Sequence, residues 1–207
     1  GEMLGGPIAA WNPRVSPNGQ ELAFAGIVDK QAQIGVMRLA SGDWTPLTTN
    51  PAVGNAQDSA WSRDNARVYF ERWQSDRPSI FWMPAVGGGR ERLLLPDAFS
   101  ARVLPDGSLL FGRWNNSGQV QLFRFWPDGE RTAPLAAIGA PGNNFAFRAF
   151  PDGKSAVFFG KPEKTPSAPD HLYIIDLDSG TTRAIAPGLT IPSRSWLFPL
   201  AISPDGA

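Results

Sequence analysis

The dipeptide Arg-Trp occurs twice in this sequence, as Arg72-Trp73 and as Arg113-Trp114. An arginine guanidinium can hold a carboxylate with two parallel hydrogen bonds, and a tryptophan ring offers a wide apolar surface with one N–H donor. Both residue types are enriched among the side chains that dominate the energy of protein interfaces. A later segment adds two lysines. The candidate ligand-binding residues are therefore Arg72, Trp73, Arg113, Trp114, Lys161 and Lys164.

Catalytic machinery is not visible in the sequence. There is no cysteine, and the one histidine, His171, has no Gly-x-Ser-x-Gly nucleophile motif to act with. A kinase would need a glycine-rich phosphate loop, a strand lysine and an Asp-bearing catalytic loop. The nearest glycine cluster, Gly87-Gly88-Gly89, leads into a strand-like segment, 90–95, which indicates a hairpin turn. We therefore predict no catalytic residues, no enzymatic activity of this chain and no cofactor.

Three carboxylates lie close together in sequence, at Asp170, Asp176 and Asp178. Residues two apart on a strand share a face, so Asp176 and Asp178 could present their carboxylates side by side. The spacing lacks the Asp-x-Asp-x-Asp-Gly pattern and the following Glu of an EF-hand calcium loop. Solvated carboxylates at a strand end are the better interpretation, and no metal site is predicted.

The composition is that of a folded protein without a charge preference. The 19 basic and 19 acidic residues give a net charge of zero, and there is no basic run, so a nucleic-acid partner is not expected. No apolar run approaches the roughly 20 residues of a membrane-spanning helix, so no membrane insertion by this segment is expected. The 22 glycines and 20 prolines favour many short strands joined by turns.

A short motif recurs along the chain: an apolar or small residue, Pro, Asp or Asn, and Gly. The copies are Ser16-Pro17-Asn18-Gly19, the degenerate Ser62-Arg63-Asp64-Asn65, Leu104-Pro105-Asp106-Gly107, Phe150-Pro151-Asp152-Gly153 and Ser203-Pro204-Asp205-Gly206. The Asp or Asn positions, 18, 64, 106, 152 and 205, are separated by 46, 42, 46 and 53 residues. Because four-stranded propeller blades repeat every 40–50 residues or so, this spacing predicts one blade per copy.

The segments around each copy predict the strands of a blade. An apolar strand follows the turn, an alternating strand follows a loop of variable length, and a glycine-containing turn leads to a short fourth strand. Gly, Asn and Asp tolerate the positive φ of tight turns, and the Asp of each copy is expected to cap its own turn. The expected second strands are 21–24, 67–70, 108–111 and 155–158, and the third strands are 34–39, 80–83, 120–125 and 172–177.

The expected fold is therefore all-β: a β-propeller of four-stranded antiparallel blades, about four blades plus the first strand of a fifth. The repeats span approximately residues 9–50, 56–96, 99–136, 144–187 and, incompletely, 194–207 of one partial propeller over 1–207. Both ends fall inside the repeat pattern. We therefore expect an arc of a larger ring, or a chain whose open blade edges need a partner and would also allow self-association.

This repeat resembles the WD40-like repeats of the TolB propeller family. The resemblance covers nearly the whole chain and is best at Trp61-Ser62, Glu21–Phe24, Ile34–Met37 and Pro46–Thr48. It implies the propeller fold strongly and a function only weakly, because the family lends its propeller to many proteins. Family members commonly have more blades than this chain provides, which again indicates a part of a larger ring.

Two further segments resemble the propellers at the C-terminal side of bacterial membrane-bound serine/threonine kinases. They are the stretch from Leu4–Pro7 through Trp11 to the first turn motif, and the segment Phe123–Pro127. This resemblance implies a sensor domain outside the cytoplasm. The expected location is therefore periplasmic or otherwise extracytoplasmic.

In propellers the loops between second and third strands share one face with the connections between blades, and variable loops of this kind tend to carry function. In this chain they are expected at 29–32, 71–78, 113–118 and 161–170, which include all the candidate residues. The alternative is that the tryptophans pack between blades and the arginines pair with nearby carboxylates.

The sequence favours a non-catalytic binding or sensing module of a larger bacterial protein, with a protein, peptide or glycan as its partner. Two other interpretations stay open. The chain could be the propeller lid of a prolyl-oligopeptidase-like serine hydrolase, whose chemistry lies in a separate domain, or a scaffold in a TolB-like envelope complex. A hydrolase domain in the same polypeptide would distinguish the lid from the binding module.

Overall fold

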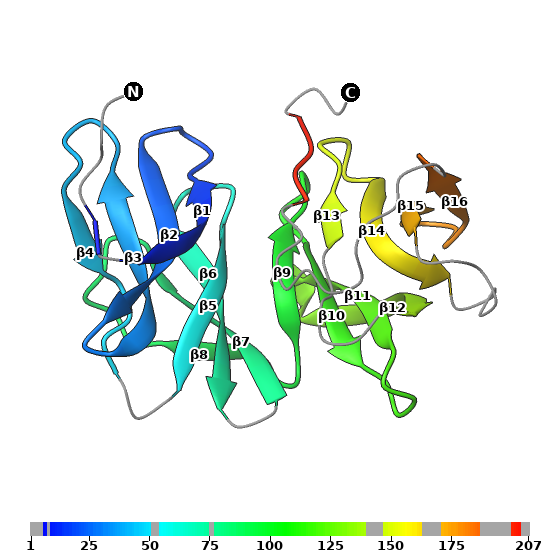
Figure 1. The fold of residues 1–207 in the computed structure, drawn as a ribbon, viewed down its shortest axis with the longest axis horizontal. Coiled ribbons are helices and arrows are strands. Elements are labelled where there is room, and N and C mark those ends of the chain that lie inside the picture. Colours follow the sequence, from blue (N-terminus) through cyan, green and yellow to red (C-terminus); the bar gives the residue numbers. More distant parts are fainter. Residues whose placement is uncertain are drawn as a thin grey trace. The chain divides into compact units, whose positions relative to one another are not determined.

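The computed structural model describes residues 6–7, 9–50, 54–74, 77–139, 147–162, 171–186 and 200–203. In this part of the chain the regular structure is sixteen β-strands and one short 3-10 turn, η2 (Pro127–Gly129). The chain divides into two compact units, residues 1–103 and 104–207, which are described separately. Counted along the chain, the strands form four sets of four, all paired antiparallel, as the repeat predicts (Figure 1).

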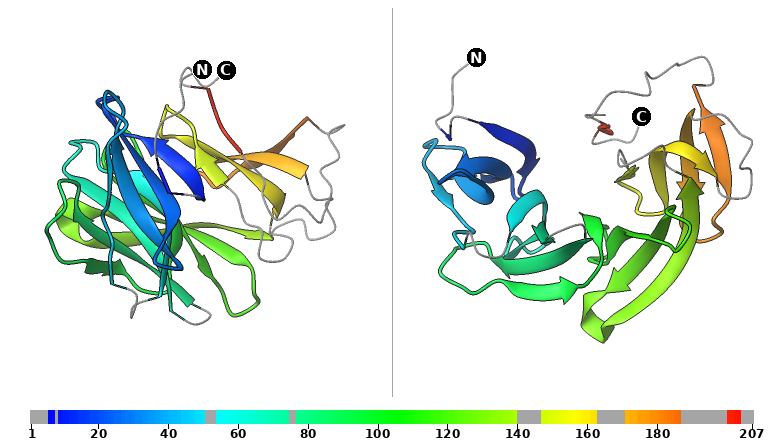
Figure 2. Two further views of the ribbon diagram at one scale, coloured as in Figure 1. Left: turned by 60° about the vertical axis from the view of Figure 1, so that its left-hand side comes forward. Right: turned by 60° about the horizontal axis from the view of Figure 1, so that its bottom comes forward.

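The first unit holds two four-stranded sheets and one further strand, each sheet built from strands in chain order. The first sheet is β1 (Ala10–Val15), β2 (Glu21–Val28), β3 (Gln31–Arg38) and β4 (Trp44–Pro46). The second sheet is β5 (Asn55–Trp61), β6 (Arg67–Gln74), β7 (Arg77–Pro84) and β8 (Arg92–Leu95), and β9 (Phe99–Val103) follows it. Figure 2 shows these sheets in blue and in cyan to green.

The second unit contains the remaining seven strands. They are β10 (Leu109–Trp114), β11 (Val120–Trp126), β12 (Arg131–Gly139), β13 (Phe147–Ala149), β14 (Ser155–Pro162), β15 (His171–Asp176) and β16 (Thr182–Ile185). β13 to β16 pair in chain order, and β12 also pairs with the end of β14 at Ile138–Pro162 and Gly139–Lys161. The predicted all-β fold of four-stranded antiparallel blades is confirmed.

The core of the first unit lies between its two sheets. Small residues of the first sheet, such as Ala23 and Ala25, face large residues of the second, such as Trp61 and Phe70, and all four side chains are buried. Alternation along each strand places these residues on one face, since successive side chains point to opposite sides of a sheet. Burial of a large apolar side chain stabilises a fold by about 1.5–3 kcal/mol, so this layer is a main source of stability.

An aromatic residue at one position of the second strand is repeated in every blade. Phe70 stacks on Phe81, Phe111 on Phe123 and Phe158 on Tyr173, each on its direct cross-strand partner at 5.5–6.2 Å between ring centroids. Such cross-strand aromatic pairs stabilise sheets and fix their register. In the first blade Phe24 instead covers Gly35, where an added Cβ would lie 2.7 Å from the ring.

The turn motifs behave as the sequence predicts, because the Asp or Asn side chain caps its own turn. The side-chain oxygen accepts the backbone N–H two residues later in all four copies that the structure describes, at 2.9–3.1 Å. At Asp64, hydrogen bonds from the Ser62 hydroxyl and the Ala66 N–H lower the pKa of the carboxyl group. The fifth copy, 203–206, lies almost wholly outside the described residues.

Two turn glycines in the second unit allow a matched stability test. Gly107 and Gly153 both have positive φ, 85° and 66°, but an added Cβ meets nothing at Gly107 and lies 2.6 Å from Pro105 Cδ at Gly153. A left-handed conformation costs a residue with a Cβ about 1–2 kcal/mol. We expect Gly107→Ala to lose about that much unfolding free energy in urea and Gly153→Ala to lose clearly more, and equal losses would contradict the contact with Pro105.

Candidate functional site

The hairpin register places the loop between second and third strands at one end of a blade and the capped turns at the other. β2 pairs with β3 up to Val28–Gln31, and β10 pairs with β11 up to Trp114–Val120. The described candidate residues lie near this end of β6, β10 and β14, on the strands themselves and not in the loops where the sequence places them. Lys161 is half-buried on β14, opposite Gly139 of β12, and Lys164 lies outside the described residues.

Arg72 lies inside the first unit. Its side chain is 0% exposed, and its guanidinium makes two hydrogen bonds to the Glu91 carboxylate, one of them at 2.7 Å from Nε to Oε2. Nη1 also donates to the carbonyl oxygen of Gly54 at 2.5 Å. This geometry is the one that the alternative interpretation describes, an arginine paired with a nearby carboxylate.

The other three described candidates lie at or near strand ends, each half-buried. The Trp73 indole N–H donates to Glu71 Oε1 at 3.1 Å, which fixes the ring. The Arg113 guanidinium lies over the rings of Phe111 and Phe123, at 5.2 and 5.3 Å from the centroids. Trp114 ends β10 in the place that Trp73 has near the end of β6. Each thus retains accessible surface for a ligand.

Three charged residues on first strands of the blades form a connected group in the first unit. Asp58 of β5 accepts one hydrogen bond on each carboxylate oxygen, from Arg14 Nη2 of β1 at 2.8 Å and from Arg102 Nη2 of β9 at 2.7 Å. β5 contacts both β1 and β9, so neighbouring first strands supply the three charges. Arg14, Asp58 and Arg102 are called the Asp58 cluster below.

The arginine position of this cluster belongs to the repeat. Arg14, Arg102 and, in the second unit, Arg148 each stand two residues before a turn motif. In each, Nη1 donates to the carbonyl oxygen of the preceding residue, at 2.9, 2.7 and 2.8 Å respectively. The second blade has Ala60 at this position. This arginine stands at a constant distance from the turn motif, so the sequence carries a signal for it that lies outside the variable loops.

The backbone of the first strands also repeats. Asn12, Asp58 and Ser100 each lie four residues before a turn motif, and each has a positive φ, 52°, 33° and 54°. The pairing of β1 with β2 and of β5 with β6 shifts register at this point. Asn and Asp are the non-glycine residues that adopt this conformation most readily. A β-bulge therefore precedes the arginine position and helps to orient it.

Glu71 lies beside the Asp58 cluster and is buried. Its Oε2 accepts the backbone N–H of Ser100 at 2.9 Å, in addition to the Trp73 indole on Oε1. Burial raises the pKa of Glu71 to about 7, and the negative charge of Asp58 acts in the same direction, against the two hydrogen bonds and the charge of Arg102. Glu71 thus links the cluster to Trp73 at the end of β6.

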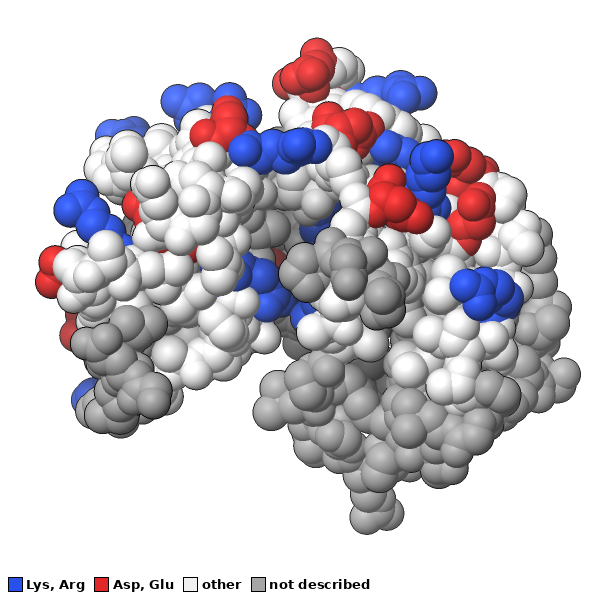
Figure 3. All heavy atoms as spheres, turned by 90° about the horizontal axis from the view of Figure 1, so that it is seen from above, with Lys and Arg blue, Asp and Glu red and all other residues white. Residues whose placement is uncertain are grey.

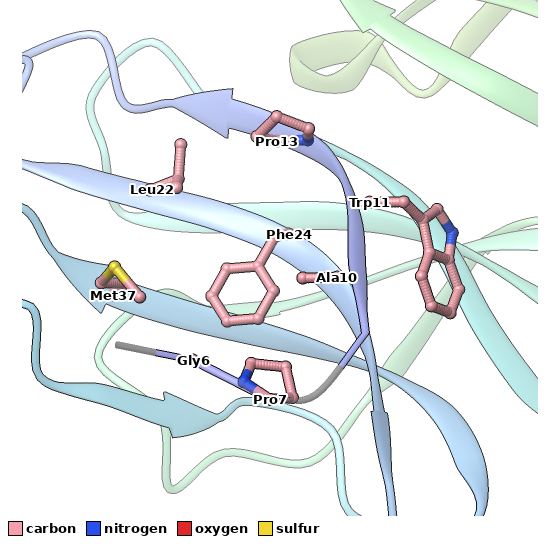
Figure 4. Close-up of a pocket in the computed structure, with 8 residues that line it drawn as sticks. All are labelled: Gly6, Pro7, Ala10, Trp11, Pro13, Leu22, Phe24 and Met37. Atoms are coloured by element: carbon pink, nitrogen blue, oxygen red, sulfur yellow. The ribbon is translucent and has the colours of Figure 1, made fainter. Parts of the chain in front are cut away.

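An apolar hollow of about 340 Å³ lies on the first sheet (Figure 4). Its lining is Gly6, Pro7, Ala10, Trp11, Pro13, Leu22, Phe24 and Met37. No charged side chain belongs to this lining, so the hollow offers apolar contact rather than a polar recognition site.

The described residues contain no group of three or more His, Cys, Asp or Glu side chains arranged to hold a metal ion. Asp176 ends β15 and caps the following turn through the Ser179 N–H at 2.7 Å, while Asp178 lies in that turn. Asp170 is outside the described residues. No helix in the described part is long and apolar enough to cross a membrane. Figure 3 shows basic and acidic side chains interspersed on the face that it presents.

Comparison with known proteins identifies the fold. No family model matches the chain, and no curated protein matches it. TolB from Acinetobacter baumannii matches with a TM-score of 0.67 and 19% identity, over 85% of this chain and 43% of TolB. A protein assigned as TolB from Agrobacterium tumefaciens matches with a TM-score of 0.69 and 19% identity, over 87% of this chain and 66% of that protein.

The same fold occurs in an enzyme. The acylaminoacyl peptidase of Pyrococcus horikoshii matches with a TM-score of 0.57 and 19% identity, over 87% of this chain and 32% of the peptidase. The chain thus has a TolB-like β-propeller fold, as its repeats predict, and it spans less than two thirds of each of these proteins.

Proposed function

We propose that this chain is a non-catalytic binding module of a larger protein, which recognises a protein or peptide at the loop ends of its blades. The observation that supports it best is the equivalent placement of two half-buried tryptophans, Trp73 and Trp114, at the loop ends of β6 and β10. Arg113 and Lys161 add positive charge at the same end of their strands. The hydrogen bond from the Trp73 indole to Glu71 holds this ring in place.

A second function is favoured by the match to the acylaminoacyl peptidase. In that case the chain is the propeller that accompanies a serine hydrolase domain. The complete gene product distinguishes the two functions, because a nucleophile elbow in the same polypeptide identifies the lid. The scaffold in a TolB-like envelope complex, the kinase sensor and the periplasmic or extracytoplasmic location remain predictions from the sequence.

Substitution of Trp73 and Trp114 tests whether the chain is a binding module. The chain is immobilised and used to capture partners from a bacterial extract, with quantification by mass spectrometry. Since aromatic anchors carry much of the energy of an interface, Trp73→Ala with Trp114→Ala is expected to reduce capture by about tenfold or more. The control is Trp126→Ala, a half-buried tryptophan at the turn end of β11. Capture by the folded double variant at the wild-type level contradicts the proposal.

A further inference from the structure

In the Asp58 cluster two guanidinium groups share one carboxylate. Asp58 accepts one hydrogen bond from each arginine, so neither arginine forms a bidentate pair with it. The Arg14 side chain is 25% exposed, and its N–H groups other than those bonded to Pro13 and Asp58 have no partner among the described residues. A guanidinium has five N–H donors, and Arg14 therefore keeps donors for a further anion.

The cluster is also preorganised. Each arginine is tied to the carbonyl of its preceding residue by Nη1 and to Asp58 by Nη2. The Trp61 indole N–H donates to the Arg14 carbonyl oxygen at 2.9 Å and holds β1 against β5. Because the side chains are already ordered, a ligand that binds there loses little affinity to the ordering of long side chains.

We propose that Arg14 and Arg102, held in place by Asp58, form a binding site for a carboxylate of a peptide ligand, either an acidic side chain or a C-terminal carboxylate. The inference rests on the proposed binding function and adds the chemistry of the ligand. It also locates a second contact on first strands, apart from the tryptophans at the loop ends.

A carboxylate suits this site better than a more highly charged anion. Each carboxylate oxygen of Asp58 accepts a hydrogen bond from the Nη2 of one arginine, at 2.8 Å from Arg14 and 2.7 Å from Arg102. The carboxylate of a ligand can be bound in the same way. Asp58 and Glu71 add negative charge close by, which opposes a doubly charged phosphate more strongly than a singly charged carboxylate. The zero net charge of the chain gives no general attraction for a polyanion.

The neighbouring acids provide the sharpest test, because they compete with the ligand. Asp58 of β5 occupies donors of both arginines, and Glu71 of β6 lies near Asp58 and Arg102. Asp58→Asn removes a negative charge and keeps one oxygen to hold one arginine, which releases the Nη2 donor of the other, and Glu71→Gln removes a negative charge without changing either of these bonds. Both variants are therefore expected to bind a carboxylate more tightly, which a purely structural role of the cluster does not produce.

The experiment is a calorimetric titration of the whole chain at pH 8 and low salt with two peptides. One is acetyl-tetraglutamate amide, which carries only side-chain carboxylates, and the other is acetyl-tetraglycine with a free C-terminus. We expect at least one peptide to bind, and Arg14→Gln to weaken it about tenfold, as the loss of a charge-assisted hydrogen bond does. Asp58→Asn is expected to tighten it about as much, and the peptide that binds identifies the source of the carboxylate.

Arg77→Gln is the matched control, since Arg77 lies on β7 of the same unit and its contact with Asp97 is exposed, at 3.6 Å. Absence of binding by both peptides overturns the inference. So does equal weakening by Arg77→Gln and Arg14→Gln, or weaker binding by a folded Asp58→Asn variant. Capture at the wild-type level by the folded Trp73→Ala, Trp114→Ala variant overturns the binding module instead, so the two failures are distinguishable.

Discussion

Replacing Glu91 with alanine is expected to lower the free energy of unfolding of the first unit by about 3–5 kcal/mol, as removal of one partner of a buried ion pair does elsewhere. The reason is the position of Arg72. Its guanidinium is fully buried, and Glu91 supplies the carboxylate that compensates its charge. Without Glu91 the charge stays in a low-dielectric interior, where the contacts left to it among the described residues are the Gly54 carbonyl and the Phe70 ring. Urea unfolding followed by tryptophan fluorescence measures the loss.

The exposed pair Arg77–Asp97 is the control for this prediction. Its side chains are 77% and 57% exposed, so Asp97→Ala is expected to change stability by less than about 1 kcal/mol. A second variant separates charge from packing. Arg72→Met in the Glu91→Ala background removes the buried charge and should recover much of the loss. If the double variant is no more stable than Glu91→Ala, the cost does not come from the uncompensated guanidinium.

The fold could be predicted because its determinants are local and repeated. A turn that needs positive φ selects Gly, Asn or Asp, and this requirement recurs at Gly19, Gly107 and Gly153. The aromatic residue of the second strand recurs because each blade needs the same cross-strand pair. Spacing alone therefore identifies the blades. The exception is Phe24, whose partner is Gly35, yet the ring fills the same place.

The different fates of Arg72 and Arg113 could not be predicted from local sequence. Both follow an aromatic residue by two positions and precede a tryptophan. Arg72 is buried because Glu91, nineteen residues later in the chain and just before β8, reaches its guanidinium. Arg113 stacks on two phenylalanine rings and stays half-buried. A contact between distant segments thus decides which of the two arginines keeps accessible surface.

The arginines of the Asp58 cluster are the opposite case, because their position is visible in the sequence. The arginine two residues before the turn recurs at Arg14, Arg102 and Arg148, as regularly as the turn itself. The β-bulge four residues before the turn cannot be recognised from the sequence, because it is defined by the positive φ of residues such as Asp58. The hydrogen bonds of Asp58 to the two arginines depend on the contacts of β5 with β1 and β9, which lie in different sheets, and the sequence does not show these contacts.

Glu71 is expected to make the stability of this protein fall as the pH rises from about 4.5 to about 7. Burial raises the pKa of its carboxyl group from 4.5 to about 7 in the folded state, so folded protein keeps a proton that unfolded protein has released. Where the folded state binds more protons, stability falls with increasing pH. A shift of this size corresponds to about 3 kcal/mol, and above about pH 7 this contribution stays constant.

The Glu71→Gln variant removes the titration and keeps the shape of the protonated acid, although its one amide oxygen can accept either the Ser100 N–H or the Trp73 indole N–H and not both. Its unfolding free energy is expected to lack the decline between pH 5 and 7, and to exceed that of the wild type at pH 8 by about 3 kcal/mol at most. His171 is the only histidine, so both proteins are compared in a His171→Gln background. Parallel stability curves for the two proteins would show that Glu71 stays ionised when folded, with Arg102 and the Ser100 N–H compensating its burial.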